Sequence, residues 1–150
     1  PAPLPEAAMD NARSIAARIV GALASCGIFS VEMFVSGDDV YFSQVTPRPS
    51  RDGLVTFVTQ RINQFDLQAH ATQRLPIDST LISPGAVRFL EGHPSQAALA
   101  AAMAVEEVTV RMLGDGTLVL ATADSAAEAR QRTDEAVREI HKIDGKPGEN

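Results

Sequence analysis

The sequence predicts an α+β fold in which antiparallel strands pack against helices. Two pairs of short segments rich in β-branched and aromatic residues, at 28–47 and 106–123, each surround a turn of glycine and aspartate. Between and around them, longer segments repeat apolar residues every three or four positions. A chain of 150 residues can form one domain or two small ones. We expect two linked parts, at 1–76 and 77–143, followed by a disordered tail at 144–150.

The first element is predicted to be a helix over residues 6–25. Apolar residues recur at helical spacing from Met9 to Leu23, Pro5 suits a helix start, and Gly27 lies shortly after the last apolar position. The preceding "PAPLPE" has prolines at every second position, which disfavours helix and strand alike. We therefore expect a linker there, with further sequence before it.

The segments "IFSVEMFVS" and "DVYFSQVTP" predict a hairpin that turns at residues 37–39. Simple alternation places Glu32 on the same face as Phe34 in the first strand, and Gln44 on the same face as Phe42 in the second. Glu32 would then lie among apolar neighbours, where a lone carboxylate is costly unless it has a partner.

A proline-rich loop, "TPRPSRDG", follows the hairpin and presents Arg48, Arg51 and Asp52. The next segment has a loosely helical pattern, which predicts a helix over 58–73 that ends before Leu75 and Pro76.

The last third of the chain predicts a strand, a helix, a second hairpin and a final helix. The strand is expected at 83–92, the alanine-rich helix at 95–105, and the hairpin at 106–123. The final helix, over 125–143, begins with Ser125 and has Glu128 three positions later, the pattern of a capping box.

Charge and composition exclude several classes of partner. The net charge is -6 and no basic run exists, so we expect neither nucleic acid nor an anionic membrane as a partner. No apolar run approaches the roughly 20 residues that span a bilayer, and because the segment before the first helix has neither a basic nor an apolar region, we expect no signal peptide. The single cysteine, Cys26, rules out an intrachain disulfide, and we expect a cytoplasmic protein.

The polar residues of the first hairpin and its loop are the candidate site. A carboxylate pair on adjacent strands can hold a divalent cation, but here the second member is an amide, so Glu32 and Gln44 form either a degenerate metal site or a hydrogen-bonded pair. Glu32 could equally be satisfied by Arg48 or by a backbone amide. Arg48, between two prolines, suits a phosphate or pins its own loop to a carboxylate. Arg51 and Asp52 form a solvated turn pair in the simplest interpretation.

One run, "GIFSVEMFVSGDDVYFSQVTPRPSRDGLVTFVTQ", resembles the C-terminal part of the ATP-grasp domain in the formate-dependent glycinamide ribonucleotide transformylases (phosphoribosylglycinamide formyltransferase 2). Those enzymes show a similar Val-Glu strand, a Gly-Asp turn and a Pro-Arg-Pro loop. The segments "RINQFDLQAHATQRLPI", "VEEVTVRML" and "LVLATADSAAEARQRTDEA" are similar to the parts that follow, so the resemblance covers about 6–143.

The resemblance implies an ATP-grasp lobe followed by a small β-rich closing domain, with ATP and Mg²⁺ as cofactors. It also implies that the family's front part, including the lid that grips ATP, is absent. In the family two strand glutamates bind Mg²⁺; Glu32 stands at the first position and Gln44 replaces the second. The family's His-Asp after Pro-Arg-Pro, whose aspartate contacts the substrate, is Ser50-Arg51 here, with Asp52 one place late. The family's late arginine pair, which binds the substrate phosphate, has no counterpart in "RMLGDGTLVLA".

We expect that the chain alone binds no cofactor and does not catalyse ATP-dependent formyl transfer. Three hypotheses follow. The first is a truncated relative whose missing ATP-grasp half comes from a partner chain. The second is a non-catalytic module that forms a homodimer. The third is a repurposed small enzyme or ligand-binder that uses Glu32, Tyr41 and Arg48 in a cleft between the two parts. The candidate residues are Glu32 and Arg48 for catalysis, Glu32 and Gln44 for metal, and Tyr41, Arg51 and Asp52 for substrate.

Overall fold

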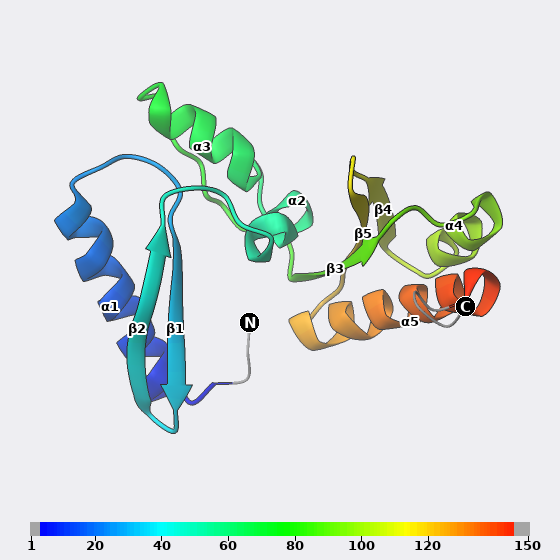
Figure 1. The fold of residues 1–150 in the computed structure, drawn as a ribbon, viewed down its shortest axis with the longest axis horizontal. Helices are drawn as coiled ribbons and strands as arrows, with labels where there is room; N and C mark the ends of the chain where they lie inside the picture. The colour runs from blue at the N-terminus through cyan, green and yellow to red at the C-terminus, as the bar shows by residue number, and fades with distance from the viewer. Residues whose placement is uncertain (1–3, 146–150) are drawn as a thin grey trace. The chain divides into compact units, whose positions relative to one another are not determined.

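A computed structural model of the chain describes residues 4–145, which form two compact units (Figure 1). The first unit comprises Pro1–Gly53 and Gln64–Ser79, and the second comprises Leu54–Asn63 and Thr80–Asn150. The units interleave along the chain, whereas the predicted division after residue 76 is sequential and stays a prediction. Among the helices of residues 4–145, none combines the length and the apolar character that crossing a bilayer requires.

The first unit is a two-stranded hairpin with helix α1 alongside it (Figure 1). Its elements are α1 (Glu6–Leu23), β1 (Ser30–Ser36), β2 (Asp39–Thr46) and α3 (Gln64–Thr72). The predicted hairpin is confirmed: β1 and β2 pair antiparallel, and the turn uses Gly37 with a positive φ of 60°, where glycine has no Cβ to clash. Few apolar residues of this unit are buried, chiefly Ala8, Leu67 and Ala71.

The second unit is a three-stranded antiparallel sheet covered on both faces. Its strands run in the order β3-β5-β4, which places β5 in the centre. The elements of this unit and of the turn that enters it are η1 (Asp52–Val55), α2 (Thr56–Thr59), β3 (Gly85–Glu91), α4 (Gln96–Met103), β4 (Val108–Met112), β5 (Gly116–Thr122) and α5 (Ala126–Asp144).

Strand β5 supplies the core of this unit. Val119 packs with residues of α4 and α5, whereas Leu118 and Leu120 pack with Leu54 and its neighbours from the opposite side. All three β5 side chains are fully buried. Burial of such a side chain stabilises the fold by about 1.5–3 kcal/mol, so β5 contributes much of the packing energy of this sheet.

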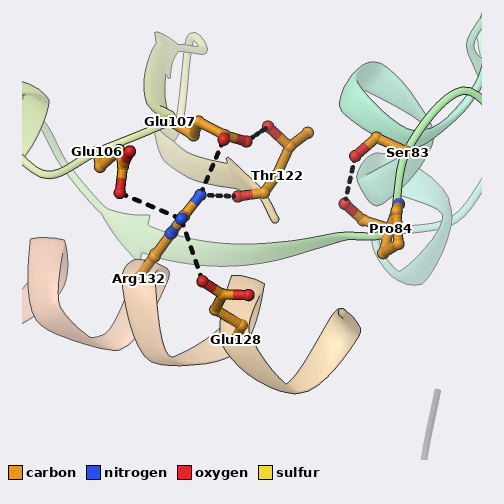
Figure 2. Close-up of polar contacts among 7 residues, drawn as sticks. All are labelled: Ser83, Pro84, Glu106, Glu107, Thr122, Glu128 and Arg132. Carbon is orange, nitrogen blue, oxygen red and sulfur yellow. Dashed lines mark hydrogen bonds and ion pairs between the residues drawn. The ribbon is translucent and has the colours of Figure 1, made fainter. Parts of the chain in front are cut away.

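Arg132 of α5 ties the turn before β4 to the final helix (Figure 2). Its guanidinium donates to the backbone carbonyl of Thr122 at 2.8 Å. The same group forms ion pairs at 3.1–3.2 Å with three glutamates, Glu106, Glu107 and Glu128. Hydrogen bonds from the Thr122 hydroxyl and from Arg132 hold the pKa of the Glu107 carboxyl below its usual value.

Three predictions about helices are tested by the structure. The first helix ends at Leu23, where Ala24 turns left-handed with φ 46°, two residues before the predicted end. Ser125 caps α5 as predicted, because its hydroxyl accepts from the backbone N–H of Glu128 at 3.1 Å. The predicted single helix over 58–73 is wrong, since α2 ends at Thr59 and α3 begins only at Gln64.

The break has a physical cause in the pairing of Gln60. This residue is extended, with φ -126° and ψ 155°, and forms an antiparallel bridge with Leu81. The backbone N–H of Arg61 donates to Thr80, and that of Ile82 donates to Thr59. A non-local ladder therefore takes the backbone groups that a continuous helix would have used.

The predicted tail at 144–150 is wrong at its first residue. Asp144 ends α5, and its carboxylate accepts from the backbone N–H and the hydroxyl of Ser95 at 2.7 and 2.6 Å. These bonds hold the pKa of Asp144 below its usual value, the hydroxyl having the larger effect. Residues 146–150 and the prolines at positions 1 and 3 lie outside the described residues.

Candidate functional site

A β-bulge at Ser43 determines which side chains share a face of the hairpin. Glu32 pairs with Gln44, but the next residue of β1, Met33, pairs with Phe42, so Ser43 is the extra residue of β2. The prediction that Gln44 and Phe42 share a face is therefore wrong, because the extra residue reverses the alternation along β2.

The bulge brings an aromatic pair beside the polar pair. Phe34, two residues after Glu32, lies opposite Tyr41, so these residues and Gln44 occupy one face. Phe34 is 65% exposed and Tyr41 is 58% exposed. The face thus presents one carboxylate, one amide and two aromatic rings to its surroundings.

Glu32 is exposed, and its hydrogen-bond partners come from β2. Gln44 Nε2 donates to Glu32 Oε2 at 2.8 Å, and the Ser43 hydroxyl donates to Glu32 Oε1 at 3.5 Å. Glu32 does lie beside apolar side chains, as predicted, but the expected desolvation cost is wrong, because its side chain is exposed and has Gln44 as a partner. Within residues 4–145 neither Arg48 nor a backbone amide is hydrogen-bonded to this carboxylate.

The Glu32–Gln44 pair, as arranged, does not fit a bound Mg²⁺. That cation takes oxygen ligands and depends on one or two carboxylates for charge. The amide of Gln44 turns its NH₂ group toward Glu32, the orientation that a neighbouring carboxylate selects. The described part of the chain contains no cluster of three or more histidine, cysteine, aspartate or glutamate side chains able to hold a metal.

The opposite face of the hairpin packs against α1 and leaves an apolar groove. The groove has a volume of about 420 Å³ and is lined by four α1 residues and one from β2, namely Ile15, Arg18, Ile19, Ala22 and Phe42. Among the described residues of the first unit, α1 packs on this side of the hairpin, whereas Glu32 lies on the opposite face.

The predicted loop residues Arg48, Arg51 and Asp52 are all exposed on the segment that follows β2. The structure brings Glu32, Gln44 and Tyr41 together on one face, and it presents the two arginines and Asp52 separately on this loop. Gln64 of α3 binds this loop, because its side-chain amide forms hydrogen bonds with the backbone of Ser50. Sequence reasoning missed Gln64, because a glutamine in an amphipathic pattern gives no signal of burial.

The histidines have structural surroundings. The Nδ1 atom of His70 lies 2.8 Å from the carbonyl of Pro76, and His93 Nδ1 lies 3.4 Å from the Thr117 hydroxyl. His141 lies in the last turn of α5.

Comparison with known proteins finds ATP-grasp relatives. The model of the ATP-grasp domain matches residues 1–65. A formate-dependent phosphoribosylglycinamide formyltransferase of Corynebacterium jeikeium is 47% identical over 91% of this chain, which spans 36% of that relative's length.

Two solved structures share the fold over most of the chain. Glycinamide-RNase-transformylase T from Mycobacterium tuberculosis superposes with a TM-score of 0.84 and 43% identity, covering 93% of this chain and 43% of that one. The N5-carboxyaminoimidazole ribonucleotide synthetase of Thermotoga maritima superposes with a TM-score of 0.83 at 25% identity, covering 92% of this chain and 43% of that one. By sequence and by fold, then, this chain belongs to the formate-dependent phosphoribosylglycinamide formyltransferase family, of whose members it spans little more than a third.

Proposed function

We propose that this chain contributes the later lobe of an ATP-grasp formyl-transfer site and does not catalyse the reaction alone. A second ATP-grasp lobe, supplied by a partner chain, would complete the site, and the reaction would belong to purine biosynthesis in the cytoplasm. The observation that carries the proposal is the open face of the hairpin, where Glu32 and Gln44 lie beside Phe34 and Tyr41.

The exposed aromatic pair supports the need for a second lobe. Two aromatic rings more than half exposed on one strand face are unusual for a finished surface, and such patches mark interaction sites. A second lobe placed over this face would bury both rings and enclose Glu32.

The loop after β2 supports an anionic substrate. Arg48 and Arg51 are exposed within four positions of each other, and guanidinium groups bind phosphate in a bidentate manner. Asp52, on the same loop, would accept from a donor group of the substrate. We assign these three residues to binding a phosphorylated amine, the class to which the relatives' substrate belongs by name.

Gln44 supports the absence of activity in the isolated chain. With an amide in place of a carboxylate, the face holds one negative charge instead of two, which weakens its attraction for a magnesium–nucleotide complex. Nucleotide would therefore bind weakly, and no step of the transfer is assigned to a metal on this face.

A non-catalytic homodimer is the second candidate, and the same exposed apolar side chains favour it. Two copies that meet through the hairpin face would bury Phe34 and Tyr41 against each other without any ligand. This candidate predicts a stable dimer whose formation does not depend on Glu32.

The deciding experiment is calorimetric titration of the 150-residue chain with Mg-ATP, together with its mass in solution. The same chain is then mixed with the Corynebacterium jeikeium relative from which the matched stretch has been deleted, and formate-dependent formylation is measured. We expect no turnover by the chain alone and turnover by the mixture, lost in Glu32→Ala. Turnover by the isolated chain would contradict the proposal, and a silent mixture with a ligand-independent dimer would establish the second candidate.

A further inference from the structure

Two glutamines of α3 lie one helical turn apart and bind backbone on either side of the hairpin. Gln64 contacts Ser50 in the loop after β2, and Gln68 contacts Ile28 just before β1. Residues four apart lie on the same face of a helix, so both side chains point toward the hairpin's ends.

Gln64 is 3% exposed and makes two opposite hydrogen bonds with one residue. Its Nε2 donates to the carbonyl of Ser50 at 2.8 Å, and its Oε1 accepts from the Ser50 N–H at 3.2 Å. A backbone N–H only donates and a carbonyl only accepts, so these partners determine the orientation of the amide. A carboxylate of the same shape could make only one of the two bonds.

The loop and this side chain are fitted closely to each other. A Cβ atom placed on Gly53 would lie 2.0 Å from Gln64 Oε1, far inside any allowed contact. Glycine is therefore required at this position by the close approach of the amide.

Gln68 uses its amide differently. Its Oε1 accepts from the Ile28 N–H at 2.6 Å, and the same oxygen would lie 3.2 Å from a Cβ on Gly27. This bond needs only an acceptor, which a carboxylate also provides. Gln68 is thus a matched control for Gln64 on the same helix.

We propose that Gln64 is the positioning residue of the loop 47–53, where its amide fixes the backbone that carries Arg48, Arg51 and Asp52. The effect on the loop stands on the geometry alone, whereas its consequence for substrate binding rests on the proposed function above. The residue touches no reacting group; it acts through Ser50.

The first test compares Gln64→Glu with Gln68→Glu by amide hydrogen exchange of the full chain. At pH 7 the carboxylate of Gln64→Glu can still accept from the Ser50 N–H, but it has no hydrogen to donate to the Ser50 carbonyl, and the two oxygens repel each other. We expect this repulsion to displace Ser50 from the side chain, so that protection of the Ser50 amide falls by about tenfold. Near pH 4 a buried carboxyl is protonated and donates again, so protection returns toward that of the parent chain at the same pH. Gln68→Glu should leave the Ile28 amide protected at both pH values.

Parent protein at each pH is the reference, because the loop carries its own Arg51 and Asp52. Equal protection of Ser50 in Gln64→Glu and in the parent at pH 7, or a deficit that is as large near pH 4, would overturn the positioning role. Gly53→Ala is a second, uncharged variant that displaces the same amide, and it should lower Ser50 protection even if Gln64→Glu does not fold.

The second test uses the assembly with the deleted relative. Gln64→Glu should raise the KM for the phosphoribosylglycinamide substrate about tenfold while the KM for ATP stays unchanged. An assembly that is inactive even with the parent chain would refute the proposed function. The hydrogen-exchange result would then still decide whether Gln64 positions the loop. An unchanged KM despite a displaced Ser50 would overturn the link between the loop and the substrate.

Discussion

Replacing Gln44 with glutamate would convert the hydrogen-bonded Glu32–Gln44 pair on the hairpin face into a pair of like charges. In the parent chain the Gln44 amide donates to Glu32 at 2.8 Å. Gln44→Glu removes this donor and sets two carboxylates side by side on the cross-strand pair. We expect the variant to be less stable without a divalent cation and to recover when one is added.

The size of the effect follows from the separation and the exposure. Two unit charges about 4 Å apart repel by about 1 kcal/mol in water, and the face is open enough for that value to apply. Loss of the hydrogen bond to the charged Glu32 adds about 1 kcal/mol, because solvent weakens a bond on an exposed face. The free energy of unfolding should therefore fall by about 2 kcal/mol in low salt, which lowers the Tm of a chain of this length by several degrees.

Thermal unfolding followed by circular dichroism, with and without Mg²⁺, is the assay. At ten times its dissociation constant a cation that binds only the folded state adds about 1.4 kcal/mol, so Mg²⁺ should restore most of the loss in Gln44→Glu and have no matching effect on the parent. The control is the exchanged pair Glu32→Gln with Gln44→Glu, which again has one carboxylate and one amide and should be as stable as the parent.

The reasoning would be refuted if Gln44→Glu melted with the parent in low salt and responded to Mg²⁺ no more than the parent does. The two side chains would then not be close enough to interact, and the face could not serve as a metal site with either residue. A variant that lost stability while the exchanged pair lost as much would point instead to a requirement for the amide on β2.

Three further predictions concern the second unit. Arg132→Ala removes the guanidinium that pairs with three glutamates, so their like charges should lower the Tm by several degrees, and added salt should restore part of this loss. Arg138→Ala, on the exposed side of α5, should leave the Tm unchanged. Asp144→Asn should lower the free energy of unfolding at pH 7. Because the pKa of the Asp144 carboxyl is depressed in the folded state, its stabilising contribution exists above the ordinary aspartate pKa and is lost as the pH falls through the folded-state pKa. In this pH range the stability of the variant should therefore vary less than that of the parent, and the control Asp124→Asn should not show this change. Leu120→Ala should reduce the free energy of unfolding by about 3 kcal/mol in a urea titration, and an m-value unchanged from the parent would show that only packing was lost.

Both hairpins and the final helix could be predicted because their signals are local. The turn at Gly37 and the cap at Ser125 depend on residues within four positions, so a single sequence contains what is needed. The same holds for the exposure of Arg48 and Arg51, which follows from the prolines that keep their loop out of helix and strand.

The features that escaped prediction depend on partners far along the chain. The bulge at Ser43 is a one-residue change of register with no compositional signature, yet it moves Tyr41 to the face of Glu32. The helix break at Gln60 depends on Leu81, and the burial of Gln64 depends on Ser50. The helix break and the burial of Gln64 both depend on backbone hydrogen bonds with residues distant in sequence, which the periodicity of apolar residues within a segment cannot reveal.

The chemistry of the hairpin pair bears on how the chain could act in an assembly. Two carboxylates on adjacent strands repel each other unless a cation lies between them, so such a pair couples folding of its strands to the metal. A carboxylate with an amide partner, as in Glu32 and Gln44, satisfies itself and leaves the hairpin independent of any cation. What remains unsatisfied on this face is apolar: Phe34 and Tyr41 are more than half exposed. The driving force for completing the face is therefore burial of aromatic surface, which favours a protein partner over a metal as the first event.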